Sequence, residues 1–207
     1  TTTIDITLQD ILEQELITML DSCDAEWASA VLMEVSTGDI KAISNVERDT
    51  TGNYVEAYNR IVTAYEPGSV VKPISMMIAL EDGLVNDIDE IIPIGASFPY
   101  GGGRAITDSH FNSQLTVAGV IEQSSNIGMA RIIVRGYDKN PAGFVKRFED
   151  LGFFEKMNSG IYEEEQPRIH RNPSRLDMSR MCFGYATAIP PLYTLSVYNA
   201  IANNGRY

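Results

Sequence analysis

Apolar side chains recur at the spacing of an α-helix in several parts of the chain. The first such stripe consists of Leu8, Ile11, Leu12, Leu16 and Met19. Thr7 precedes it, with Asp10 three residues later, and this pattern predicts a cap at the start of a packing helix. Further helices are predicted over residues 69–82, where Leu80 is expected in the core, over 116–135 and 191–203, and between Pro141 and Gly152.

Two shorter apolar runs, 27–35 and 40–45, have the length and mixed character of strands. The sequence between them is Ser36-Thr37-Gly38-Asp39, which is typical of a turn, so we expect an antiparallel hairpin covered by helices. Glycine and proline are frequent over 85–108, which is predicted to be a loop. The stretch 162–174 contains three consecutive glutamates and is predicted to be a solvated surface segment.

The composition is that of an acidic, folded protein. The 207 residues are 44% hydrophobic, which supplies a core, and no repeat or linker demands a second domain, so we predict one domain over 1–207. The formal net charge is −12, with 16 basic residues against 28 acidic ones. Nucleic acid and anionic membrane surfaces are therefore disfavoured partners, since both need clustered lysine and arginine. The sequence contains neither a signal peptide nor an apolar run of about 18 residues.

Cysteine and histidine are too sparse to indicate a metal site, and no cofactor is predicted. Cys23 and Cys182 are expected to be free, mostly buried thiols, because two cysteines make no disulfide framework and neither lies in a Cys-x-x-Cys motif. His110 and His170 lack a second ligand at helical spacing. We expect His110 to be a loop residue.

The segment Glu66-Pro67-Gly68-Ser69-Val70-Val71-Lys72-Pro73 carries the strongest chemical signal. Residues three apart on a helix are neighbours, so the Lys72 amine can reach the Ser69 hydroxyl and activate it as a nucleophile. Pro73 has no N–H to return to the Ser69 carbonyl, so we expect a tightened or distorted first turn. The alternative is an ordinary helix-start serine beside a surface lysine, and Ser-x-x-Lys alone does not exclude it.

A second motif, Ser124-Ser125-Asn126, lies within the predicted helix 116–135. It is also too short to identify a site by itself, and its polar residues could simply interrupt a helix. In this order, and with the flanking Pro-Gly and Ile-Gly pairs, the two motifs resemble those of the penicillin-recognising serine transferases, which include penicillin-binding proteins and serine β-lactamases.

Other segments extend this resemblance over nearly the whole chain. The predicted hairpin is similar to the first hairpin of that family, and Asn59-Arg60 is similar to the approach to the nucleophile in class B penicillin-binding proteins. Phe183-Gly184-Tyr185 and the residues from Pro190 to Gly205 look like the part that precedes the third family motif. The nearest type is the division-type peptidoglycan D,D-transpeptidase. The resemblance implies an α/β (α+β) fold with helices around an antiparallel sheet.

The resemblance also implies a mechanism and partners. Ser69 would be the catalytic nucleophile, Lys72 its base and Ser124 a proton relay, while Asn126 would hold the Lys72 side chain and a substrate amide. Peptidoglycan stem peptides and β-lactam antibiotics would acylate the serine, and no metal or cofactor would take part. The family acts on the outer, periplasmic face of the cytoplasmic membrane, anchored by an N-terminal segment and assembled with other division or cell-wall synthesis proteins.

One departure from the family pattern is serious. None of the five lysines is followed by Thr-Gly or Ser-Gly, so the third motif is missing, and with it the strand that supplies substrate contacts and one oxyanion donor in the family. Losing one such donor typically costs about 2.7–4 kcal/mol of transition-state stabilisation. We therefore expect an incomplete fold and a poor or inactive catalyst in this chain alone. A β-lactam sensor, a β-lactamase or a non-catalytic scaffolding module, which could self-associate through an exposed sheet edge, are the alternatives.

Overall fold

The computed structural model describes residues 2–206, which form two compact units. The first unit contains residues 2–64, 158–165 and 190–206, and the second contains residues 65–157 and 166–189. Each unit has its own buried apolar residues, and each is described here by itself. The assignment of 1–207 to one domain stays a prediction.

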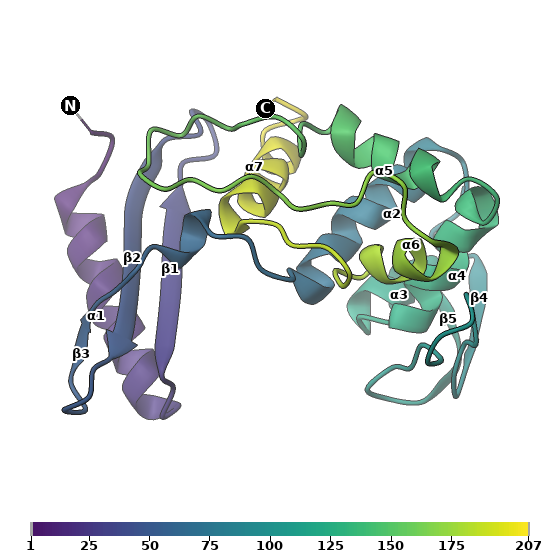
Figure 1. Ribbon diagram of the computed structural model, residues 1–207, viewed down its shortest axis with the longest axis horizontal. Coiled ribbons are helices and arrows are strands. Elements are labelled where there is room, and N and C mark those ends of the chain that lie inside the picture. The colour runs from purple at the N-terminus through teal and green to yellow at the C-terminus, as the bar shows by residue number, and fades with distance from the viewer. Residues whose placement is uncertain (1, 207) are drawn as a thin grey trace. The chain divides into compact units, whose positions relative to one another are not determined.

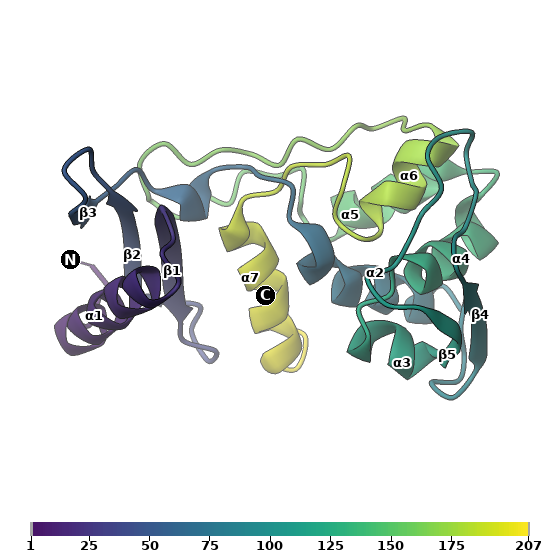
Figure 2. The same ribbon diagram turned by 90° about the horizontal axis from the view of Figure 1, so that it is seen from below.

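The first unit is built on a three-stranded antiparallel sheet with the order β1-β2-β3. Its strands are β1 (Trp27–Met33), β2 (Ile40–Arg48) and β3 (Tyr54–Glu56). Helix α1 (Ile6–Ser22) runs alongside β1 and β2 in both views of the molecule (Figures 1 and 2). The Gln9 carboxamide connects helix and sheet, because it donates to the Ile43 carbonyl at 2.9 Å and accepts from the Ile43 N–H at 2.8 Å.

The predicted hairpin is confirmed, although β2 continues to Arg48 and β3 was not expected. The cap predicted at Thr7 is wrong. The Asp5 carboxylate accepts from the backbone N–H groups of Thr7 and Leu8, so the helix begins earlier. The unit also contains the short 3-10 helix η1 (Arg60–Val62) and α7 (Pro191–Ala202), which contact each other. Helix α7 confirms the prediction for 191–203, with Pro191 in its first turn.

The second unit is mainly helical, and α4 (Asn126–Tyr137) lies in its interior. Residues Ile127, Met129, Ala130, Ile132 and Ile133 of this helix are completely buried. Around it pack α2 (Lys72–Glu81), α3 (Val117–Glu122), α5 (Pro141–Asp150), α6 (Arg175–Met181) and β4 (Ile91–Gly95), which pairs with β5 (Asn112–Thr116). Helices combined with antiparallel strands confirm the predicted α+β class.

Three predictions for the second unit need correction. The helix expected over 116–135 is interrupted at residues 123–125, so the second motif lies at a break between α3 and α4. The loop expected over 85–108 includes β4, in which the buried Ile92 and Ile94 alternate with exposed positions and which pairs with β5. Leu80, expected in the core, is 46% exposed. Helix α6 was not predicted, whereas α5 confirms the helix between Pro141 and Gly152.

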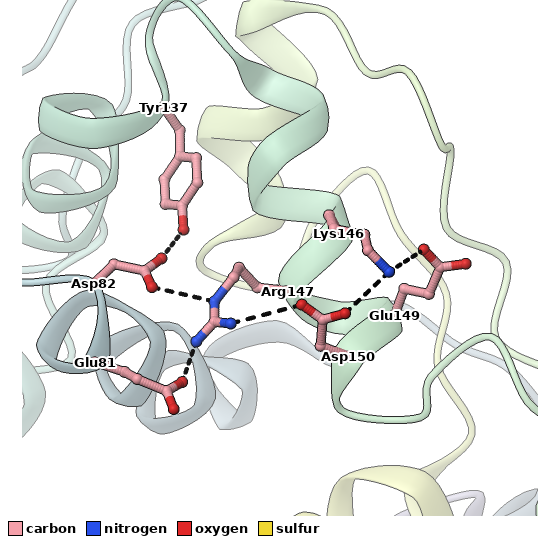
Figure 3. A network of polar contacts seen from close by, with 7 residues as sticks. All are labelled: Glu81, Asp82, Tyr137, Lys146, Arg147, Glu149 and Asp150. Carbon is pink, nitrogen blue, oxygen red and sulfur yellow. Dashed lines mark hydrogen bonds and ion pairs between the residues drawn. The ribbon is translucent and has the colours of Figure 1, made fainter.

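A network of charged side chains joins the end of α2 to α5 and α4 (Figure 3). Arg147 of α5 pairs with Glu81, with Asp82 at 3.3 Å and with Asp150 at 3.6 Å. Asp82 also accepts a hydrogen bond from the Tyr137 hydroxyl of α4. The network fixes the end of α2 at the surface of the unit.

Candidate active site

The backbone before Ser69 is shaped by two close glycines. Gly68 has φ 61°, and its N–H donates to the Gly184 carbonyl at 3.0 Å. A Cβ atom on Gly184 would lie only 2.0 Å from the Gly68 carbonyl oxygen. The two chain segments can therefore approach this closely only because residue 184 has no side chain.

The first turn of the nucleophile segment is a 3-10 helix, η2 (Gly68–Val71), and α2 follows from Lys72. Pro73 cannot donate to the Ser69 carbonyl, which instead accepts the N–H of Lys72 three residues on. The distorted turn expected from Pro73 is confirmed. It places the Ser69 side chain at the exposed start of the helix and the Lys72 side chain in the interior.

The Lys72 amine lies among three oxygen atoms. Its Nζ is 3.1 Å from Ser69 Oγ, 2.5 Å from the carbonyl oxygen of Ser124 and 2.9 Å from Ser124 Oγ. Only 2% of the residue is exposed. The structure therefore brings together three of the predicted residues, Ser69, Lys72 and Ser124, from segments more than 50 residues apart in sequence.

Burial controls the protonation of this amine. Desolvation lowers the pKa of Lys72 from 10.5 to about 8, while the charge of Asp108 and an interaction with Cys182 act in the opposite direction. About a tenth of such amines are neutral at pH 7, compared with fewer than about one in a thousand for an ordinary lysine. The oxygens nearest to Lys72 are neutral, so they solvate the amine without fixing its charge as a paired carboxylate would.

The second motif residues have three different surroundings. Ser124 is exposed and has φ 50°, in the left-handed region that non-glycine residues rarely adopt. Ser125 is buried and caps α4 by accepting from the Gly128 N–H at 2.8 Å. The Asn126 carboxamide donates to the Thr107 carbonyl at 3.1 Å. Its predicted hold on the Lys72 side chain therefore stays a prediction.

Sequence reasoning missed Asp108, whose carboxylate contacts Ser125, Asn126 and Ile127 at the start of α4. An aspartate in a glycine-rich segment gives no local signal of this contact, since it lies 17 residues from Ser125. His110, two residues further on, belongs to no helix or strand, as expected.

Both cysteines are free. Cys182 is completely buried, and burial raises the pKa of its thiol, so the side chain stays uncharged. Cys23 is exposed, contrary to prediction, because it follows the end of α1 at the surface. Across residues 2–206, no cluster of three potential metal ligands exists, and no helix has both the length and the apolar character needed to cross a bilayer.

A Ser-x-x-Lys pair at the mouth of a helix, brought together with a Ser-x-Asn element in a fold of helices and antiparallel strands, is the arrangement of the penicillin-recognising serine transferases. Residues 28–207 match the family described as the penicillin-binding protein transpeptidase domain. The chain belongs to this family, and the resemblance drawn from its motifs is confirmed.

Individual relatives agree with this assignment. The chain is 32% identical to the peptidoglycan D,D-transpeptidase FtsI of Escherichia coli K12 and 28% identical to FtsI of Buchnera aphidicola, in both cases over 99% of its length. The apo structure of the TP domain from Burkholderia pseudomallei penicillin-binding protein 3 is similar, with a TM-score of 0.84 at 26% identity. That match covers 99% of this chain and 58% of the other. The chain spans only 35% and 36% of the two FtsI proteins.

Proposed function

We propose that this protein is a serine D,D-transpeptidase that cross-links peptidoglycan stem peptides during cell-wall synthesis and division. One observation carries the proposal: Ser69 Oγ lies 3.1 Å from the nitrogen of a buried lysine whose pKa is about 8. A nucleophile within hydrogen-bond reach of a base that is partly neutral at working pH is the arrangement that acyl transfer needs. The names of the FtsI relatives support the same activity.

The geometry supports a role for each residue of the pair. A neutral amine has two N–H bonds and one lone pair, and the two oxygens of Ser124 can accept both N–H bonds. The lone pair is then free to take the proton from Ser69 as its oxygen attacks the carbonyl between two D-alanines. An ester bond forms between the carbonyl carbon and Ser69 Oγ, and the amide bond to the terminal D-alanine breaks. The D-alanine nitrogen takes up the proton as it leaves. An amine of a second stem peptide later attacks the ester, takes the acyl group and frees Ser69.

Ser124 and Asn126 act on the substrate side of this step. The Ser124 hydroxyl lies 2.9 Å from Lys72 Nζ and is exposed, so it can pass the proton from the lysine to the leaving amine. Asn126 is partly exposed and presents its carboxamide oxygen for a substrate amide, while its nitrogen donates to Thr107. One oxyanion donor is the N–H of Ser69 itself, at the positive end of η2 and α2.

β-Lactam antibiotics acylate the same serine, because their strained amide resembles the D-Ala-D-Ala bond. The protein works on the extracytoplasmic side of the cytoplasmic membrane, held there by an anchoring segment, beside other division or cell-wall synthesis proteins. These partners and this location are proposed for the whole protein.

Labelling with a fluorescent penicillin tests the proposal directly. The chain and a Ser69→Ala variant are incubated with the reagent, and intact mass spectrometry detects the adduct. Ser36→Ala, in the exposed turn of the hairpin, is the matched control. Because this chain alone is expected to be a poor catalyst, we expect a slowly formed but long-lived adduct on the parent chain and on the control, and none on Ser69→Ala.

The other outcomes separate the alternatives. An adduct that survives in Ser69→Ala would remove Ser69 as the nucleophile. Rapid release of a hydrolysed product would favour a β-lactamase. A folded chain that is never labelled would favour a non-catalytic module.

A further inference from the structure

The backbone at Ser124 is held in a conformation that needs support. Its φ of 50° lies in the left-handed region, where a side chain crowds the following carbonyl. In this conformation both oxygens of Ser124 reach Lys72, the carbonyl at 2.5 Å and the hydroxyl at 2.9 Å. A strained residue persists only where its surroundings determine it, so the contacts of the turn at 123–125 decide whether these hydrogen bonds form.

On the α3 side, the N–H of Ser124 donates to the Ile121 carbonyl at 3.0 Å and the N–H of Ser125 donates to the Val120 carbonyl at 2.9 Å. On the α4 side, the contacts come from one carboxylate outside the helix. Asp108 Oδ1 accepts from the backbone N–H groups of Asn126 at 2.6 Å and Ile127 at 3.0 Å. Its Oδ2 accepts from the Ser125 hydroxyl at 2.5 Å. Ser125 Oγ in turn accepts from the Gly128 N–H, so the first N–H groups of α4 are all satisfied by Asp108 and Ser125. The two residues on the helical side of Ser124 are thereby fixed in place.

The same loop also holds a substrate-side group. The carbonyl of Thr107, directly before Asp108, accepts from the Asn126 carboxamide at 3.1 Å. The loop is itself paired further back, because Ile106 and Phe98 exchange two backbone hydrogen bonds of 2.9 and 3.0 Å. A fixed loop therefore carries Asp108 to the break between α3 and α4.

We propose that Asp108 is a positioning residue, whose carboxylate holds the turn at 123–125 so that both oxygens of Ser124 accept hydrogen bonds from Lys72. It contributes charge as well as geometry. The groups that act electrostatically on Lys72 are Asp108 and Cys182, and the raised pKa of the Cys182 thiol leaves Asp108 as the operative negative charge. Asp108 thus raises the pKa of Lys72, against the larger effect of desolvation.

The proposal has an electrostatic part and a geometric part, and each part predicts a different result. Asp108→Asn keeps the shape of the side chain and one acceptor oxygen for the N–H groups of α4, replaces the other acceptor by an NH2 donor and removes the charge, so the pKa of Lys72 falls by at least about half a unit. Ser125→Ala keeps the charge but removes the hydroxyl that joins Asp108 to the cap of α4. It misplaces Ser124 and slows acylation by about tenfold or more, without a comparable fall in the pKa of Lys72.

The deciding measurement is an NMR titration of the lysine amines in the chain labelled with [13C]lysine. The chain has five lysines, so five signals are expected, and the signal that disappears in Lys72→Arg belongs to Lys72. Asp49→Asn is the matched control, since Asp49 Oδ1 also accepts three hydrogen bonds, from Thr51 N, Thr51 Oγ1 and Asn53 N, in the other unit. We expect the midpoint of Lys72 to fall in Asp108→Asn and to stay unchanged in Asp49→Asn.

A folded Asp108→Asn variant with an unchanged Lys72 midpoint would overturn the electrostatic part. Normal acylation in a folded Ser125→Ala variant would overturn the geometric part. The acylation readout rests on the proposed function, whereas the titration does not. Absence of labelling in the parent chain would therefore sink the proposed function and leave the titration as the test of Asp108.

Discussion

The two ends of α2 show what separates a reactive amine from a structural cation. At the start of the helix, Lys72 is 2% exposed and its nearest oxygens belong to neutral serines. At the end of the helix, Glu81 and Asp82 join a network in which each cation faces carboxylates at the surface (Figure 3). Helix α2 thus takes part in a buried cluster of neutral acceptors at its start and in a network of surface ion pairs at its end.

Lys146 in that network makes the contrast specific, because it is the same residue type as Lys72. Its Nζ is 2.9 Å from Glu149 and 3.0 Å from Asp150, and 60% of its side chain is exposed. Hydrogen bonds to these carboxylates raise the pKa of Lys146, whereas desolvation lowers that of Lys72 to about 8. Burial against neutral acceptors makes an amine available as a base, and pairing with carboxylates at the surface does the reverse.

The largest expected effect comes from replacing Lys72 by arginine, with Lys146→Arg as the matched control. A guanidinium stays protonated at any working pH and cannot accept a proton from Ser69. We expect Lys72→Arg to slow acylation by fluorescent penicillin by about 10²–10⁴-fold, the usual contribution of general base catalysis. Lys146→Arg should leave the rate unchanged, because its charge is retained in an exposed pair. Equal rates for the parent chain and a folded Lys72→Arg variant would remove Lys72 as the base.

The second prediction concerns the backbone beside the nucleophile. Gly184→Ala puts a Cβ 2.0 Å from the Gly68 carbonyl oxygen and also strains a φ of 89°. Gly152→Ala is the matched control, since its φ is 83° and no atom lies within 4 Å of the added Cβ. In urea unfolding we expect a loss of about 3 kcal/mol or more for Gly184→Ala and about 1–2 kcal/mol for the control. A similar loss in both variants would show that the close approach of the two segments adds nothing.

Local sequence predicted those parts of this site that depend on neighbouring residues. Ser69 and Lys72 are three apart, and Pro73 removes a single N–H, so both the pair and the distorted turn could be expected. The strands of the hairpin and the helix starting at Pro191 also follow from local patterns. The family itself was recognised because its motifs are local too.

Contacts between distant segments could not be predicted in this way. The apolar spacing of Val117, Val120 and Ile121 continues into α4, so nothing local indicated that the helix breaks at Ser124. The side-chain contacts at the start of α4, after the break, come from Asp108 in another loop. Likewise, β4 was missed because its pairing depends on β5, some 20 residues later.

The third prediction is a pH dependence of stability that arises from Lys72. Its pKa is about 8 in the folded chain and 10.5 when unfolded, so between these values the unfolded state binds more protons. Stability should therefore increase with pH in this window and be independent of this group below about pH 8. Relative to Lys72→Met, which cannot titrate, we expect the parent chain to gain about 2 kcal/mol from about pH 8 to pH 9.5.

The measurement is urea unfolding of both proteins at several pH values. Lys146→Met is the control, because this variant keeps the contribution of Lys72 to the pH dependence of stability. The difference between parent and Lys72→Met is informative because the titration of all other groups cancels. A flat difference over this pH range would show that the amine is solvated in the folded chain.

The smallest expected effect is at the far end of α2. Arg147→Met keeps the aliphatic stem but removes the guanidinium that pairs with Glu81, Asp82 and Asp150. Three partners and a side chain only 25% exposed make this more than an ordinary surface pair, and we expect a loss of about 1 kcal/mol in urea unfolding at low salt. About 0.5 M salt should reduce that loss, since exposed carboxylates are screened.

Lys146→Met should change stability less than Arg147→Met, because its pairs are exposed and stay within α5. If Lys146→Met lowers the free energy of unfolding as much as Arg147→Met does, the network stabilises α5 itself and does not hold the end of α2 in place. The end of α2 would then not be the structural counterpart of the reactive start of the helix.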